Sequence, residues 1–214
     1  MHSLPFFQAK LDRRIDLLEA AFLRVSINRN SIGRVDRFAV QTGLISETWQ
    51  AWNSFCRSVI LASLQGTTSA CGVAVSSTYS NNTVDEIRFA AMRAAQGNSI
   101  NILRPISGDH LEPTWGDMGK ANTIIGALAP SNRSQLQSAF GSSVLLTDFQ
   151  KLRNACVHIS SDRLDDIRHM QVRYSSNRFL HPSDCIYWVD PKTKDYSWVS
   201  WTDEMKLVAK AAVA

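Results

Sequence analysis

The sequence has few cysteines, and no two of them stand at the spacing of a metal-binding motif. Cys56, Cys71, Cys156 and Cys185 include no C-x-x-C pair, whereas structural zinc sites are usually built from such pairs. We therefore expect no metal and no other cofactor. Cys56 and Cys156 fall on the apolar faces of predicted helices, where free buried thiols are common.

Long hydrophobic runs are also absent. No apolar stretch approaches the about 20 residues that a membrane-spanning helix needs. The first residues, MHSLPFFQAKLDRR, do not place a basic segment before an apolar one, as a secretory signal does. The sequence therefore predicts a soluble, cytoplasmic protein without a membrane partner.

Several catalytic and nucleotide-binding patterns are missing. No P-loop and no G-x-G-x-x-G occurs, which excludes nucleotide binding by those loops. No G-x-S-x-G occurs, so the sequence contains no nucleophile-elbow pattern. Asp165 and Asp166 are adjacent and point in different directions on a helix, so we interpret them as solvated residues rather than a catalytic pair.

The composition is that of an ordinary globular protein. The chain has 214 residues, of which 44% are hydrophobic and 20% are charged, and its formal net charge is +4. This length is sufficient to bury a substantial core. The mild positive charge permits a polyanionic partner without requiring one.

Apolar residues recur at helical spacing through most of the chain. Spacings of three and four over residues 5–26 predict an amphipathic helix. A second helix is predicted from Ser46, a candidate N-cap, to Gly66, a candidate C′ glycine. Trp49 and Trp52 lie on its apolar face, and we expect them in the core rather than in a ligand platform.

Local signals predict the remaining elements. Thr83 with Glu86, and Thr147 with Gln150, form capping-box patterns that open two helices. Two loop-rich insertions are predicted at about residues 66–82, around a short β-like GVAV, and at about 98–115. Further helices are predicted near 117–128, 131–140 and 162–173 and from about Thr202, and a β-hairpin is predicted at about 185–199. The expected fold is a mainly α single domain over residues 1–214, with one small β-hairpin near the C-terminus.

The predicted helix over residues 147–160, TDFQKLRNACVHIS, carries polar residues opposite an apolar stripe. At about 100° per residue, the core face is formed by Phe149, Leu152, Cys156 and Ile159. Asn154 and His158 lie together nearly opposite this face, with Arg153 on the flank between. Histidine transfers protons near neutral pH, and arginine binds phosphate oxygens. One helix therefore carries a candidate proton-transfer group and a candidate phosphate-binding cation on its polar side.

The sequence RNACVH, residues 153–158, resembles the R-x4–6-H motif of HEPN domains, including the Asn that many members carry after the Arg. The segments SETWQAWNSFCRSVILASLQG and WTDEM are similar to those of a HEPN subgroup in bacterial defence and RNA-repair operons. The resemblance implies a HEPN-like helical bundle. It also implies a metal-independent endoribonuclease that acts as a toxin or antiphage defence effector.

The same resemblance implies site residues and partners. Two motif helices meet at a two-fold axis in the family, so a homodimer is expected in which both chains line one cleft. Arg153 is expected to stabilise the phosphorane, His158 to act on the 2′-OH or leaving oxygen, and Asn154 to orient the phosphate or the His. Lys151 and Arg163 are further RNA-binding candidates. The substrate is expected to be tRNA or mRNA, with an antitoxin or defence-system protein as a further partner.

The R-x4–6-H pattern is short and occurs three times among sixteen arginines and five histidines. The match Arg104…His110 contains a proline and a glycine, so it is not helical. The match Arg163…His169 lies on a predicted helix but lacks the Asn, and it is the fallback site.

Two further functions stay open. One is a non-catalytic HEPN-like module that binds nucleotides, RNA or protein, and the other is a helical protein whose basic surface and tryptophans serve only assembly. Ile159-Ser160-Ser161 follow the His, where some HEPN toxins carry a Tyr that a nucleotidyltransferase modifies, so control by that route is not expected. Lys192 and Lys194 in the predicted hairpin turn are other candidates for RNA contact, although turn solubility explains them equally well.

Overall fold

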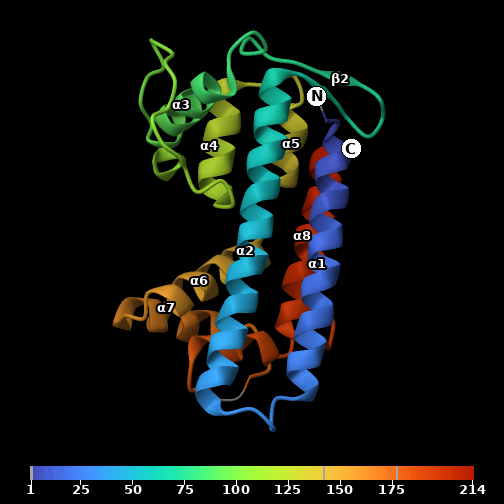
Figure 1. Ribbon diagram of the computed structural model, residues 1–214, viewed down its shortest axis with the longest axis vertical. Helices are drawn as coiled ribbons and strands as arrows, with labels where there is room; N and C mark the ends of the chain where they lie inside the picture. Colours follow the sequence, from blue (N-terminus) through green and yellow to red (C-terminus); the bar gives the residue numbers. More distant parts are fainter. Residues whose placement is uncertain (1, 142, 177) are drawn as a thin grey trace. The chain divides into compact units, whose positions relative to one another are not determined.

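The computed structural model describes residues 2–141, 143–176 and 178–214 (Figure 1). These residues are mainly α-helical, as predicted. The α-helices are α1 (Leu4–Ile27), α2 (Arg34–Gln65), α3 (Val84–Ala95), α4 (Met118–Leu128), α5 (Arg133–Ala139), α6 (Val144–Val157), α7 (Ser161–Gln171) and α8 (Ser197–Val213). Two 3-10 helices, η1 (Asp109–Leu111) and η2 (Pro182–Tyr187), and two strands, β1 (Thr67–Thr68) and β2 (Ala74–Val75), complete the described elements. No α-helix among the described residues is both long and apolar enough to cross a membrane.

The chain folds into two compact units, each built from segments that are distant in the sequence. Unit 1 consists of Met1–Leu11, Trp52–Ser142 and Lys206–Ala214. Unit 2 consists of Asp12–Ala51 and Ser143–Met205. Three of the boundaries fall inside α1, α2 and α8, so each of these helices contributes residues to both units.

Unit 1 contains α3, α4, α5 and the strand pair, and α4 packs against both α3 and α5 (Figure 1). The predicted capping box at the start of α3 is confirmed. Thr83 Oγ1 accepts from the Glu86 N–H, and a Glu86 carboxylate oxygen accepts from the Thr83 N–H at 2.9 Å. Trp52 is fully buried, meets Phe140 edge-on at 6.2 Å, and donates from Nε1 to the Gly116 carbonyl at 3.2 Å.

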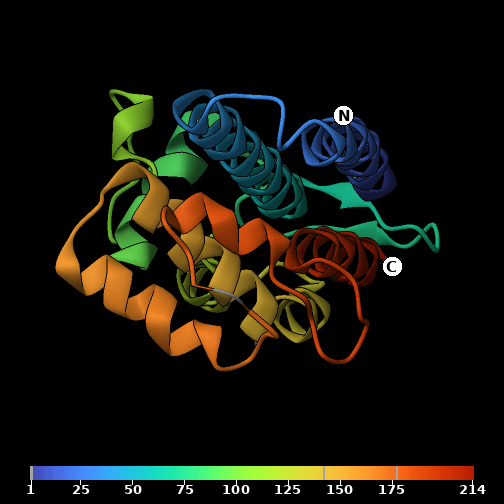
Figure 2. The ribbon, with the colours of Figure 1, turned by 90° about the horizontal axis from the view of Figure 1, so that it is seen from below.

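Unit 2 is centred on Phe149 of α6, which is fully buried. Its ring centroid lies 6.4 Å from Trp49, 6.4 Å from Trp198 and 5.5 Å from Trp201. Because Trp49 is only 4% exposed, its predicted place in the core is confirmed. Helix α6 also packs against α7 and η2, the elements seen from below in Figure 2.

The β-hairpin lies at a different place from the predicted one. Strands β1 and β2 pair antiparallel within the loop-rich segment at 66–82, whereas residues 185–199 form the end of η2, a turn and the start of α8. In that region Val189 makes only isolated bridges, to Ser175 and to Tyr196. The bridge to Tyr196 consists of the bonds from Ser197 N–H to the Trp188 carbonyl at 2.7 Å and from Asp190 N–H to the Asp195 carbonyl at 2.9 Å. The pairing extends no further on that side because α8 begins at Ser197.

Helices α2 and α8 begin much earlier than predicted. Helix α8 begins at Ser197 instead of near Thr202, and α2 begins at Arg34 instead of Ser46. The first turns of α2 carry exposed apolar residues such as Val35, so their apolar pattern is weak. They are held by long-range contact instead: Gln41 is fully buried and accepts from Ser183 Oγ at 2.9 Å. The predicted end of α2 is confirmed by Gly66, which has a φ of +104°.

Candidate functional site

Helix α6 carries the three predicted catalytic residues, and it begins before the predicted start. Its N-cap is Ser143, whose Oγ accepts from the Leu146 N–H at 3.2 Å. Thr147 lies inside the helix, and its Oγ1 donates to the Ser143 carbonyl at 3.1 Å. The predicted capping box of Thr147 and Gln150 is therefore wrong. Ser143 supplies the same cap chemistry one turn earlier, and the helix gains Val144 and Leu146.

Helix α6 ends at Val157, and His158 is its C-cap rather than a residue of the helical body. His158 has a φ of −131°, and its N–H donates to the Asn154 carbonyl at 2.9 Å. The imidazole is exposed and makes no hydrogen bond to another described residue. The helix end therefore presents His158 to its surroundings as a group whose ring nitrogens are both open to a ligand.

The predicted core face of α6 is only partly confirmed. Phe149 and Leu152 are fully buried, but Cys156 is half-buried and Ile159 is 59% exposed. Ile159 lies beyond the end of the helix, so the helical spacing that placed it in the core no longer applies. Ala155 takes the corresponding buried position.

Arg153 and Asn154 lie close together. Arg153 Nη1 donates to Asn154 Oδ1 at 3.2 Å, and both side chains are half-buried. Arg153 Nε is buried without a hydrogen-bond partner, and no carboxylate among the described residues pairs with this guanidinium. Its positive charge is thus held in place by a neutral amide and remains available to an anion.

The neighbouring cations are paired. Lys151 Nζ lies 3.8 Å from Asp166 Oδ1, and Arg163 Nη1 lies 3.3 Å from Asp166 Oδ2. Arg168 Nη1 pairs with Asp165 Oδ1 at 2.6 Å. The two predicted RNA-binding residues, Lys151 and Arg163, therefore share one carboxylate. Since these pairs are partly exposed, each is weak and does not prevent contact with a polyanion.

The fallback match Arg163…His169 lies on α7, and both residues are exposed. Six residues of α-helix place their side chains about 120° apart around the helix axis. Arg163 is paired with Asp166, and the His169 ring has no described hydrogen-bond partner. The side chains of Arg163 and His169 are therefore not brought together by the fold.

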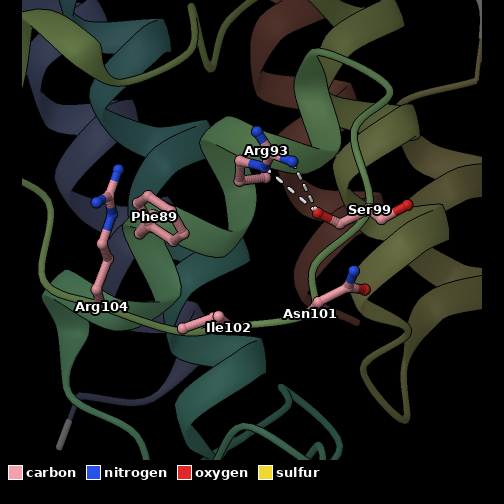
Figure 3. A pocket seen from close by; sticks show the side chains of 6 residues that line it. All are labelled: Phe89, Arg93, Ser99, Asn101, Ile102 and Arg104. Carbon is pink, nitrogen blue, oxygen red and sulfur yellow. Dashed lines mark hydrogen bonds between the residues drawn. The ribbon is translucent and has the colours of Figure 1, made fainter.

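The third match, Arg104…His110, lies in unit 1, and no helix contains both residues, in agreement with the prediction. His110 belongs to η1, whereas Arg104 lies in the loop before it, over the Phe89 ring at 4.9 Å. Arg104 and Phe89 line a pocket of about 230 Å³ with Arg93, and His110 does not line it (Figure 3). Arg93 Nη2 donates to the Ser99 carbonyl at 3.1 Å, so its guanidinium holds the loop.

Lys192 and Lys194 are exposed in a turn, as expected for turn residues. Lys194 has a φ of +67°, and its N–H donates to the Asp190 carbonyl at 2.9 Å. The turn joins the segment after η2 to α8 instead of joining two strands.

A buried carboxylate on α6 is absent from the sequence-based predictions. Asp148 is 1% exposed and accepts from Arg173 Nε at 3.0 Å and from Tyr174 Oη at 2.9 Å. Tyr174 Oη in turn accepts from Trp201 Nε1 at 2.9 Å. Burial and the nearby Asp148 carboxylate both raise the pKa of Tyr174. Every group of this network is engaged within the fold, so its role is structural. The sequence did contain an indication that Asp148 is buried, because Asp148 lies one helical turn before the apolar residue Leu152 and therefore shares its face of the helix.

The cysteines are free thiols, of which Cys56 and Cys185 are buried. Burial raises the pKa of Cys156 to about 12, so this thiol stays protonated at neutral pH. Within the described ranges, no group of three or more His, Cys, Asp and Glu residues could hold a metal ion. Comparisons of the chain with models of known protein families, with curated proteins and with solved structures gave no significant match.

Proposed function

We propose that the protein is a metal-independent endoribonuclease of the HEPN type that cleaves RNA by attack of its own 2′-OH. One observation carries this proposal: Arg153 is fixed by Asn154, has no described carboxylate partner, and precedes the exposed His158 at the end of the same helix. A cation free to bind phosphate and an open imidazole, carried by the same helix, are the two groups that this reaction needs.

Each residue has a role that its surroundings permit. The Arg153 guanidinium binds the non-bridging phosphate oxygens and stabilises the extra negative charge of the phosphorane. The exposed His158 ring takes the proton of the 2′-OH or delivers one to the leaving 5′-oxygen. Asn154 is a positioning residue, because it acts on the phosphate through Arg153.

A second copy of the chain would supply the second proton-transfer group. One His158 cannot serve as base and acid at the same moment, whereas a two-fold interface presents the same helix end twice. Val157 and Ile159, which flank His158, are 45% and 59% exposed. A dimer that buries these two apolar side chains brings two His158 rings to one cleft. A defence-system or antitoxin protein that covers this helix end would control the enzyme.

The test is cleavage of total tRNA and of mixed single-stranded RNA by the purified protein, with and without EDTA. We expect cleavage that survives EDTA and leaves 2′,3′-cyclic phosphate ends. His158→Ala and Arg153→Ala should each lower the rate by about 100-fold or more. His169→Ala is the matched control, because His169 is an exposed histidine on the neighbouring helix. Loss of cleavage in His169→Ala, with activity kept in His158→Ala, would transfer the site to α7.

A non-catalytic module that binds RNA is the second candidate. The observation in its favour is that the His158 ring makes no hydrogen bond to Arg153 or Asn154 within one chain, so the monomer holds a phosphate-binding Arg without an oriented base. RNA binding that depends on Arg153 but not on His158, without cleavage at any protein concentration, would favour this module.

A further inference from the structure

Three arginines that the R-x4–6-H motif does not include line a pocket in unit 2. Arg29 comes from the turn after α1, Arg37 from the first turns of α2, and Arg178 from the segment before η2. The pocket has a volume of about 480 Å³, which is within the range of small-molecule sites. Its position is therefore defined by residues that are far apart in the sequence and adjacent in the fold.

The pocket carries an excess of positive charge. Asp184 is the one acidic residue in its lining, and one of its carboxylate oxygens accepts from the Leu180 and His181 N–H groups at 3.1 and 3.2 Å. This carboxylate is thereby engaged in holding the start of η2. None of the three arginines forms an ion pair with any described residue, so two positive charges remain uncompensated. Such an excess attracts an anion.

Three polar atoms of the lining are buried without a partner. Arg37 Nε, Tyr187 Oη and Asp184 Oδ1 have no hydrogen-bond partner among the described residues and are shielded from solvent. Leaving a buried polar group unsatisfied costs about 1–3 kcal/mol, and more for a charged group. An anion accepts from Arg37, a ligand hydroxyl or ring nitrogen pairs with Tyr187, and a ligand hydroxyl donates to Asp184 Oδ1. A ligand that carries both an anion and hydroxyl groups therefore removes all three costs.

Aromatic rings form the rest of the lining. The Arg29 guanidinium carbon lies 4.3 Å from the Tyr187 ring centroid, and Phe179 meets Trp188 at 6.0 Å. Guanidinium groups bind phosphate oxygens in a bidentate manner, and aromatic and guanidinium planes stack on nucleobases. A phosphate group in the ligand would account for the positive charge of the pocket, and a planar nucleobase would account for its aromatic lining.

We propose that this pocket binds a phosphorylated nucleoside, either as a free nucleotide or as the 5′-phosphate end of an RNA strand. Arg37 and Arg178 bind the phosphate, and the pair of Arg29 and Tyr187 contacts the nucleoside. The pocket includes none of Arg153, Asn154 and His158. The proposal therefore stands independently of the ribonuclease proposal.

The test is a binding titration in the full-length His158→Ala protein, which prevents cleavage of RNA probes. The probes are 5′-AMP, adenosine, inorganic phosphate, and one short RNA with a 5′-phosphate or a 5′-hydroxyl. We expect saturable binding of 5′-AMP or of the 5′-phosphorylated RNA, and much weaker binding of adenosine and of the 5′-hydroxyl RNA. Tighter binding of the phosphorylated RNA than of 5′-AMP identifies the strand end as the ligand, and the reverse identifies a free nucleotide.

Charge-removing variants locate the site. Arg37→Gln should weaken binding by about tenfold or more, and Arg178→Gln, at an exposed position, should do so without affecting folding. Arg34→Gln is the matched control, because Arg34 lies on the same helix but does not line the pocket. The proposal is overturned if no phosphorylated probe binds, if inorganic phosphate binds as tightly as 5′-AMP, or if Arg34→Gln weakens binding as much as Arg37→Gln and Arg178→Gln.

Discussion

Asp148 and Arg173 form an ion pair in which the carboxylate is 1% exposed and the guanidinium is 41% exposed. Among the residues that the structure describes, Arg173 and the hydroxyl of Tyr174 are the groups that compensate the charge of this buried carboxylate. Removing that charge leaves Arg173 without its partner and weakens both hydrogen bonds.

We expect Asp148→Asn to lower the free energy of unfolding by about 2–4 kcal/mol. The measurement is urea denaturation followed by tryptophan fluorescence, because Trp201 belongs to the same network. Asp162→Asn, at an exposed position on α7, is the control and should change stability by less than about 0.5 kcal/mol. Equal effects of the two substitutions would contradict a structural role for Asp148.

Two substitutions of Asn154 distinguish the charge of Arg153 from its positioning. Asn154→Asp should pair with the guanidinium and neutralise it, whereas Asn154→Ala only frees it. Under the ribonuclease proposal, we expect Asn154→Asp to weaken RNA binding more than Asn154→Ala and to lower the salt dependence by about one phosphate contact. The measurement is RNA affinity over a series of salt concentrations in the His158→Ala background. Stronger binding by Asn154→Asp than by Asn154→Ala would show that Arg153 does not contact phosphate.

The two candidate N-caps of α6 differ in their expected contribution to stability. Ser143→Ala removes the hydroxyl that accepts from the Leu146 N–H and should cost about 1 kcal/mol. Thr147→Ala removes only a donor to the Ser143 carbonyl and should cost less. Thermal or urea unfolding of the two variants compares them directly. A larger loss in Thr147→Ala would mean that the helix begins at the later residue.

We expect the free energy of unfolding to decrease at mildly acidic pH because of His181. Burial lowers the pKa of His181 from 6.5, and the Asp184 carboxylate opposes this shift. The neutral ring accepts the Ser183 N–H at Nδ1 at 3.2 Å and stacks on Phe38. Between the folded and unfolded pKa values the unfolded chain binds more protons, so stability is present above about pH 6.5 and falls as the pH drops through the folded pKa.

This decrease can be assigned to one residue by comparing the free energy of unfolding at pH 7.5 and pH 5.5. We expect a smaller difference in His181→Asn, which keeps a side-chain acceptor but does not titrate. The same difference in both proteins would assign the pH dependence to other groups.

Local sequence signals predicted the ends of two helices correctly. Thr83 with Glu86 and Gly66 with its positive φ mark true helix ends. At α6 the predicted cap, Thr147, lies one turn after the observed cap, Ser143, and the apolar residues Val144 and Leu146 between them belong to the helix. The alternating residues near Val189 indicated a hairpin, but side-chain burial in a turn produces the same alternation.

The arrangement of the site depended on longer-range contacts. The proximity of Arg153 and Asn154 follows from their adjacency, and the polar character of that helix face could be predicted. The burial of Asp148 requires Arg173 and Tyr174, which no helical pattern on α6 reveals. The pocket of three arginines joins Arg29, Arg37 and Arg178, so no single stretch of sequence contains its charge.

Helices α1, α2 and α8 each pass from one compact unit to the other. During translation, neither unit has all its residues until α8 has left the ribosome, since both units include part of that helix. A chain interrupted before α8 lacks Trp198 and Trp201, two rings that contact Phe149. An incomplete product therefore lacks part of the core that supports α6, the helix that carries Arg153 and ends at His158. Under the ribonuclease proposal, the site would form only after α8 has been synthesised.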